Sequence, residues 1–123
     1  MQLTREFHFD AAHSLTNYEP GHPNTRMHGH SFRVRVTLEG QPVKTSGQIM
    51  DLTDFGTVLE AARLQLDHHL LNEIEGLSLP TLENICLWLW DNLQTDLPTL
   101  YAIEVFRDSL GQSCLYKGSQ HGR

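Results

Sequence analysis

Two stretches of alternating polarity decide the fold: FHFDAAH at residues 7–13 and HGHSFRVRV at residues 28–36. Odd positions of the first are apolar until His13, and even positions of the second are apolar after His28 and His30. Successive side chains of a strand point to opposite faces, so each stretch predicts a strand whose buried face is extended by its histidines. We therefore expect the three histidines to meet in the interior.

Histidines in this arrangement favour a metal site. Neutral imidazole is the commonest metal ligand in proteins, and three of them leave the fourth position of a tetrahedral zinc ion open, as in catalytic sites. The alternatives are buried histidines that only hydrogen-bond, or a histidine that faces solvent where a strand ends. The HxH pair with a third histidine in register favours zinc held by His13, His28 and His30.

Further short strands are expected on both sides of a helical region. A brief apolar segment at residues 49–52 predicts a short third piece after the first two strands. Residues 102–107 and 113–116 alternate like strands around the hairpin turn signal DSLG. The irregular stretch at residues 14–27 is long for a compact domain and is typical of a functional loop, whereas residues 119–123 are expected to form a frayed tail.

Two helices are predicted between these strands. From Thr53 the apolar residues follow helical spacing, with Asp51 or Thr53 as the N-cap, and this helix is expected to end near Asn72. The second helix opens after Pro80, and its apolar stripe runs to Leu93. The order is ββ, α, α, ββ, which predicts an α+β fold in which two helices lie on one face of a sheet.

Composition limits the partners and the compartment. With 123 residues, the chain is expected to form a single domain over residues 1–123. A formal charge of −6 with nine Lys and Arg argues against a nucleic-acid partner. We see no signal peptide and no apolar run of ~18 residues, so we expect a cytoplasmic protein that does not enter the membrane. Cys86 and Cys114 are expected to be free thiols.

The residues also match a family. Five motifs fall in order along nearly the whole chain: FDAAH at 9–13, HGHSF at 28–32, DLTDF at 51–55, LDHHLLN at 66–72 and PTLEN at 80–84. Together they resemble the 6-pyruvoyltetrahydropterin synthase and 6-carboxytetrahydropterin synthase family.

This resemblance implies a tunnelling fold (T-fold), an antiparallel sheet backed by two helices. Subunits of the family assemble into a ring, here a homohexamer arranged as a dimer of trimers, with active sites between protomers. The resemblance also implies Zn²⁺ on the three histidines and a pterin substrate resembling 7,8-dihydroneopterin triphosphate. The bacterial branch converts that substrate to 6-carboxy-5,6,7,8-tetrahydropterin on the way to queuosine.

The resemblance further implies roles for residues near the helix ends. Asp67 and His68 would form a carboxylate-oriented imidazole that relays protons near pH 7. The alternative is a histidine that is simply favoured by the helix dipole. Thr81 and Glu83 would bind the substrate, with Glu83 on the amino edge of the pterin. Glu83 could equally cap its helix, and the two roles are compatible.

Asn24 departs from the family pattern. Family members carry a cysteine base four residues before the first histidine of HGH, where this chain has Asn24. An amide cannot take a proton at neutral pH, so Asn24 can position the substrate but cannot replace a thiolate. Cys86 belongs to the apolar stripe of the second helix, and Cys114 has no evident relation to the loop. His22, in the loop itself, is the better stand-in.

A second departure concerns the carboxylate that grips the pterin ring in family members. Counting from residues 103–106 puts Arg107 at that position, whereas counting back from Tyr116 puts Asp108 there. If Asp108 faces inward through a bulge, the anchor survives. If Arg107 does, the charge is reversed, and a guanidinium suits a carbonyl, carboxylate or phosphate instead of amino and N–H groups.

Three functions are compatible with these residues. The leading one is a zinc lyase of the 6-carboxytetrahydropterin synthase type with an altered proton relay. The second is retro-aldol cleavage of the side chain towards 6-hydroxymethyl-7,8-dihydropterin, and the third is a non-catalytic zinc-binding or pterin-binding paralogue. Asn24 and the altered anchor favour the second and third. The intact histidines, Asp67 with His68, and Glu83 favour retained chemistry.

Overall fold

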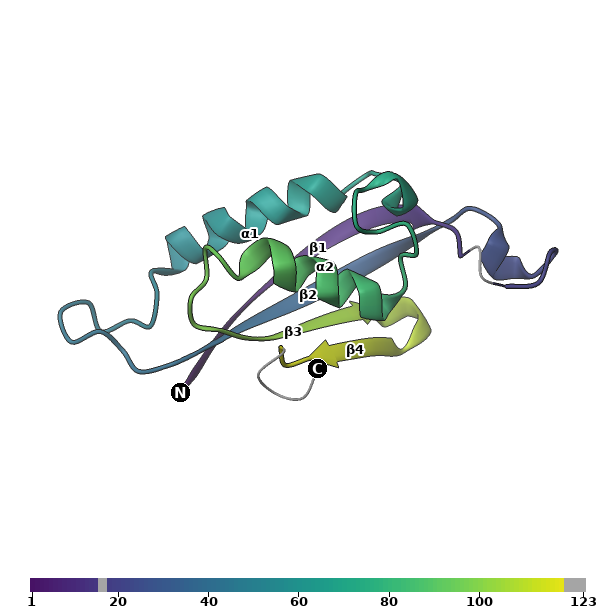
Figure 1. Ribbon diagram of the computed structural model, residues 1–123. Coiled ribbons are helices and arrows are strands. Elements are labelled where there is room, and N and C mark those ends of the chain that lie inside the picture. The colour runs from purple at the N-terminus through teal and green to yellow at the C-terminus, as the bar shows by residue number, and fades with distance from the viewer. Residues whose placement is uncertain (16–17, 119–123) are drawn as a thin grey trace.

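One antiparallel sheet and two helices make up the fold. The computed structural model describes residues 1–15 and 18–118, so the tail expected to fray, at residues 119–123, lies outside the described residues. The strands follow one another across the sheet in chain order: β1 (Gln2–His13), β2 (His28–Glu39), β3 (Leu100–Arg107) and β4 (Gln112–Tyr116). Helices α1 (Leu52–Leu66) and α2 (Leu82–Leu93) cover one face (Figure 1). The predicted α+β fold and its ββααββ order are confirmed.

The long β1–β2 pair sets the position of the histidines. Its register places His13 opposite His28, Ala11 opposite His30 and Phe9 opposite Phe32. Phe9 and Phe32 are buried under the helices, and their rings stack with centroids 4.8 Å apart. Because side chains alternate along a strand, the three histidines extend this buried face at the end of the sheet.

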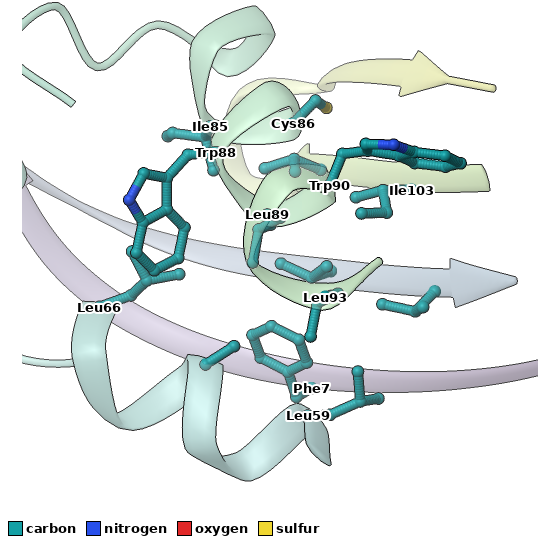
Figure 2. Packing of buried hydrophobic residues seen from close by; sticks show 14 of the residues in the cluster. Phe7, Leu59, Leu66, Ile85, Cys86, Trp88, Leu89, Trp90, Leu93 and Ile103 are labelled. Atoms are coloured by element: carbon teal, nitrogen blue, oxygen red, sulfur yellow. The ribbon is translucent and has the colours of Figure 1, made fainter. Parts of the chain in front are cut away.

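The core fills the space between the sheet and the helices. Figure 2 shows side chains from both helices, among them Leu59 of α1 and Leu93 of α2, packing with Phe7 of β1. Cys86 is part of this cluster and is 1% exposed. The apolar stripe predicted for the second helix is therefore its sheet-facing side. Within the described residues, no helix is both long enough and apolar enough to cross a bilayer.

The first helix ends earlier than its sequence pattern predicts. It stops at Leu66 and not near Asn72. The backbone N–H of Asp10 in β1 donates to Asp67 Oδ1 at 2.9 Å, and the backbone N–H of His68 donates to the carbonyl oxygen of Asp10 at 2.6 Å. His68 has φ +58°, which a continuing helix does not allow. Hydrogen bonds to the edge of β1 thus replace the next helical turn.

The prediction of a short strand at residues 49–52 was also wrong. The chain bends there and enters α1 at Leu52, with the Asp51 carboxylate accepting from the backbone N–H groups of Thr53 and Asp54. The expected hairpin turn is confirmed. A 3₁₀ turn, η3 (Asp108–Leu110), is followed by Gly111 at φ +63°, a left-handed conformation that glycine adopts without strain.

Candidate metal centre and adjoining cleft

The three histidines predicted to meet do so at the end of the β1–β2 pair. One ring nitrogen from each of His13, His28 and His30 can be chosen so that all three lie within 4.8 Å of one another. His13 Nε2 lies 3.0 Å from His28 Nε2. His13 is 1% exposed, while the other two are partly exposed. The cluster is therefore buried on one side and open on the other.

Backbone carbonyls orient two of these rings. His13 Nδ1 lies 3.0 Å from the carbonyl oxygen of Pro80, and His28 Nδ1 lies 2.7 Å from that of Arg26. A carbonyl oxygen only accepts, so each Nδ1 carries the proton and each Nε2 presents a lone pair. This is the arrangement that holds metal-binding imidazoles in other proteins, where the nitrogen not bound to metal donates to an acceptor.

The resulting contacts fit a cation. Two lone pairs that face each other at 3.0 Å repel unless a positive charge lies between or beside them. His30 Nε2 is buried and has no hydrogen-bond partner among the described residues. Burial lowers the pKa of His13, and it lowers the pKa of His30 to about 4. These rings are neutral at pH 7, which is the form that binds metals.

A cleft of about 660 Å³ opens beside the histidines. Its walls come from the loop after β1, from β2, from the start of α2 and from the β3–β4 hairpin. The lining residues predicted from the sequence are His28, His30, Asn24, Thr81, Glu83 and Arg107. The fold thus brings together residues that lie up to 83 positions apart, between Asn24 and Arg107.

Thr81 and Glu83 enter the cleft from the start of α2. The hydroxyl of Thr81 accepts from the backbone N–H of Asn84 at 3.1 Å, so Thr81 is the N-cap of the helix. Glu83 lies in the first turn, where the helix dipole favours its negative charge. Thr81 therefore caps the helix. Glu83 and Arg107 both line the cleft, and their opposite charges interact.

Asn24 lines the cleft, but none of the candidate replacement bases does. The Nδ1 atom of His22 accepts from the backbone N–H of Asn24 at 3.1 Å, and its ring stacks on Tyr18 with centroids 4.3 Å apart. Cys86 lies in the core, where burial raises the pKa of its thiol, and its Sγ donates to the carbonyl oxygen of Cys114 at 3.4 Å. The cysteines are free, as predicted.

Asp67 and His68 form the expected pair, but they lie outside this cleft. Asp67 Oδ2 is 2.8 Å from His68 Nδ1 and 3.1 Å from Arg63 Nη1. Two hydrogen bonds lower the pKa of the Asp67 carboxyl: the one from the backbone N–H of Asp10 has the larger effect, and the one from the His68 side chain comes next. The His68 side chain is 80% exposed. It lines a second hollow, together with Asp10 and Ser31.

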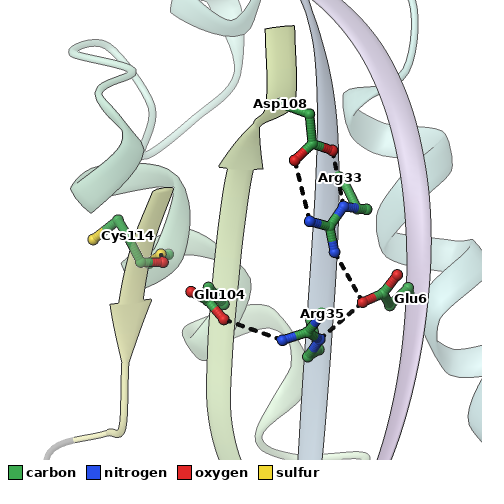
Figure 3. A network of polar contacts seen from close by, with 7 residues as sticks. Glu6, Arg33, Arg35, Glu104, Asp108 and Cys114 are labelled. Carbon is green, nitrogen blue, oxygen red and sulfur yellow. Dashed lines mark hydrogen bonds and ion pairs between the residues drawn. The ribbon is translucent and has the colours of Figure 1, made fainter. Parts of the chain in front are cut away.

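Arg107, and not Asp108, faces the cleft. Arg107 shares the side of β3 that carries Ile103 and Val105, both fully buried. Figure 3 shows Asp108 on the opposite, exposed face, where its carboxylate lies 2.9 Å from the Nε of Arg33. No bulge turns Asp108 inward. The charge at this position is therefore reversed relative to the family pattern.

Other cleft residues were missed by reasoning from the sequence. They come from the loop after β1 and from the β3–β4 hairpin: Leu15, Tyr18, Pro23, Arg26, Met27, Leu110 and Gln112, with Leu82 from α2. The length of the loop at residues 14–27 was a signal that it is functional, but an irregular loop has no periodicity from which the direction of a single side chain could be predicted.

Fold and site together define a T-fold protein with a candidate three-histidine metal centre beside a cleft. The match to the model of 6-pyruvoyl tetrahydropterin synthase extends over residues 2–119, and the chain belongs to that family. A 6-carboxy-5,6,7,8-tetrahydropterin synthase of Synechocystis sp. is 37% identical over 109 residues, which cover 84% of this chain and 83% of the relative.

Two further similarities bear on chemistry and fold. A dihydroneopterin monophosphate aldolase of Pyrococcus furiosus is 37% identical over 90 residues, covering 73% of this chain and 72% of the relative. The 6-pyruvoyl tetrahydropterin synthase structure of Caenorhabditis elegans superimposes with a TM-score of 0.84 at 24% identity, covering 97% of this chain and 96% of the other. The latter confirms the T-fold.

Proposed function

We propose that this protein is a zinc-dependent lyase of the 6-carboxy-5,6,7,8-tetrahydropterin synthase type, with 7,8-dihydroneopterin triphosphate as its substrate. The observation that carries the proposal is the meeting of three histidines beside a cleft that also holds Glu83. The Synechocystis relative and the family membership support the reaction type. With this function, the protein would take part in queuosine biosynthesis in the cytoplasm.

His13, His28 and His30 would hold the zinc. A zinc ion bound there would supply Lewis acidity that polarises oxygen atoms of the substrate side chain. The carbonyls of Pro80 and Arg26 keep the first two rings in the orientation this requires. Glu83 accepts hydrogen bonds from the amino and ring N–H groups of the pterin and so fixes the ring in the cleft.

Asp67 and His68 of a neighbouring copy would relay the proton at each cleft. Asp67 holds His68 through Nδ1 and leaves its Nε2 facing outward. In one protomer this imidazole lines a different hollow from Asn24, so it does not reach a substrate in its own cleft. We therefore place His68 of a neighbouring copy at each cleft, in the homohexameric dimer of trimers that the family resemblance implies.

Asn24 favours a second candidate, retro-aldol cleavage of the same kind of side chain to 6-hydroxymethyl-7,8-dihydropterin. Lyases of the first type must remove a proton from carbon, which needs a base at that carbon, and an amide cannot serve. Retro-aldol cleavage starts by removing a hydroxyl proton, which is far more acidic. The Pyrococcus relative supports this reaction. A non-catalytic zinc-binding or pterin-binding paralogue is the third candidate.

Product identification separates these candidates. The zinc-loaded protein is incubated with 7,8-dihydroneopterin triphosphate, and the products are identified by mass spectrometry, with the His28→Ala protein as control. A carboxytetrahydropterin or pyruvoyl product that depends on His28 supports the leading proposal. A hydroxymethyl product establishes retro-aldol cleavage instead, and unchanged substrate would contradict both enzymes.

A further inference from the structure

Among the described residues, Arg107 is a partly buried cation without a hydrogen-bonding or ion-pairing partner. Arg33 and Arg35 form ion pairs with Glu6 on the exposed face of the sheet (Figure 3), and Arg63 pairs with Glu60. In the parts of the chain at residues 1–15 and 18–118, the guanidinium of Arg107 has no hydrogen bond or ion pair, and its Nε is buried without a partner. Arg107 lines the cleft. Because buried donors are nearly always satisfied, a guanidinium with unpaired donors beside a cleft points to a ligand there.

The residues around Arg107 indicate which hydrogen-bonding groups that ligand must carry. Burial lowers the pKa of Arg107, and the nearby Glu83 carboxylate opposes this shift. Arg107 still carries its charge at neutral pH, because the pKa of a guanidinium starts far above neutrality. Arg107 only donates and Glu83 only accepts when ionised. A ligand that satisfies both must therefore present an oxygen acceptor beside N–H donors.

We propose that Arg107 is a specificity-determining residue that donates to the ring carbonyl of the substrate, while Glu83 accepts from the adjacent ring N–H and amino groups. This inference rests on the proposed pterin substrate. The edge of a pterin carries an amino group, a ring N–H and a carbonyl oxygen in sequence, so the charge pair matches it in polarity. A ring with an amino group in place of the carbonyl would set two donors against each other.

A substrate phosphate also offers oxygen acceptors to a guanidinium. The partial burial of the Arg107 side chain favours the ring carbonyl, because a triphosphate carries several charges that are costly to remove from water. Arg26, which also lines the cleft, is exposed and so suits a charged end that stays in solvent. The two sources of oxygen are separated by comparing ligands with and without phosphate.

The test measures dissociation constants for matched ligands of the zinc-loaded protein. The first pair is pterin and 2,4-diaminopteridine, which differ in the carbonyl, and the second is neopterin and neopterin triphosphate. The variants are Arg107→Met, which removes the donors, and Arg107→Glu, which reverses them. Arg35→Met is the matched control, because Arg35 is an arginine of the same sheet on the opposite face. Thermal unfolding and zinc content check that each variant folds.

The wild type is expected to bind pterin about tenfold or more tightly than 2,4-diaminopteridine, as one charge-assisted hydrogen bond predicts. Arg107→Met should remove most of this preference, Arg107→Glu should reverse it, and Arg35→Met should keep it. An equal affinity of the wild type for both rings overturns the inference without any variant. So does a preference that survives in Arg107→Met, while pterin binding itself still supports the proposed function.

Phosphate recognition has its own signature. If Arg107→Met weakens binding of neopterin triphosphate but not of neopterin, Arg107 meets a phosphate and the ring assignment is wrong. A wild type that binds none of the four ligands would instead overturn the proposed pterin substrate, and this inference with it. Failure of the inference alone is therefore distinguishable from failure of the proposed function.

Discussion

At the scale of single residues, Asn24 determines which reactions the cleft can support. It lines the cleft four positions before His28, where the family resemblance implies a cysteine base. The alternative bases do not line the cleft: the ring of His22 stacks on Tyr18 but is not among the lining residues, and the Cys86 thiol is buried in the core. Proton removal from carbon is therefore the step that this chain is least equipped to perform.

Asn24→Cys should restore that step. A thiolate at this position would act as the missing base, so the rate of carboxytetrahydropterin or pyruvoyl product formation should rise about tenfold or more. The rate is measured by mass spectrometry of the product at saturating substrate. Asn24→Ser is the control, since a hydroxyl of similar size is too weak an acid to replace a thiolate. An unchanged rate in Asn24→Cys would count against the leading function.

Individual site residues could be predicted from the sequence only where a regular element fixes their direction. His13, His28 and His30 follow from strand alternation, and the structure brings them together as predicted. The sequence did not decide whether Arg107 or Asp108 faces inward. Counting from the two sides of the hairpin gives positions one residue apart, and a shift of one residue moves a side chain to the other face of the sheet. The structure settles the register by pairing Arg107 with Gln112.

At the scale of elements, the start of α2 supports both the core and the metal centre. Thr81 caps the helix, and the preceding Pro80 carbonyl orients the ring of His13. Glu83 follows in the first turn and lines the cleft. The cap thus connects helix stability to the position of a candidate metal ligand, His13, and of the Glu83 carboxylate in the cleft.

Thr81→Ala should destabilise the protein by about 1 kcal/mol, because the backbone N–H of Asn84 loses its acceptor. Chemical denaturation of the wild type and the variant measures the difference in free energy of unfolding. Thr81→Ser keeps the hydroxyl and should stay within about 0.5 kcal/mol of the wild type. Equal loss in both variants would show that the methyl group, and not the cap, stabilises this site.

The end of α1 shows what local sequence patterns miss. The apolar spacing continues through Leu70, and on periodicity alone the helix should continue with it. Instead, Asp67 and His68 hydrogen-bond to Asp10 in β1, and Leu70 forms a bridge with Ala12. These partners lie 57 residues or more away in the sequence, so no window along the chain contains them. Tertiary hydrogen bonds overrode the helical pattern.

At the scale of the whole molecule, the candidate machinery is divided between two hollows at the end of the β1–β2 pair. His28 and Asn24 line the cleft, and His68 lines the second hollow. Among the described residues, His30 alone lines both. The sequence predicted the pairing of Asp67 with His68, but their separation from the cleft depends on how the end of α1 docks on β1.

Complementation between inactive variants tests whether neighbouring copies complete each site. His28→Ala lacks a proposed metal ligand and His68→Ala lacks the proposed proton relay, so each alone should be inactive. Co-expressed chains that assemble at random should regain about one quarter of wild-type activity, because each site needs one intact contribution from two copies. Mixing His28→Ala with His13→Ala, which both alter the candidate metal centre of one copy, is the control and should recover nothing. If the mixture of His28→Ala and His68→Ala is also inactive, the shared site is contradicted.

The most direct test of the account is the zinc content of the purified protein after dialysis against a weak chelator, measured by inductively coupled plasma mass spectrometry. The wild type should retain about one zinc per chain, and His28→Ala should retain almost none, since two imidazoles hold zinc far more weakly than three. His8→Ala, an exposed histidine of the same sheet, should match the wild type. A wild type without zinc, or equal zinc in His28→Ala, would contradict the metal centre on which the proposed function rests.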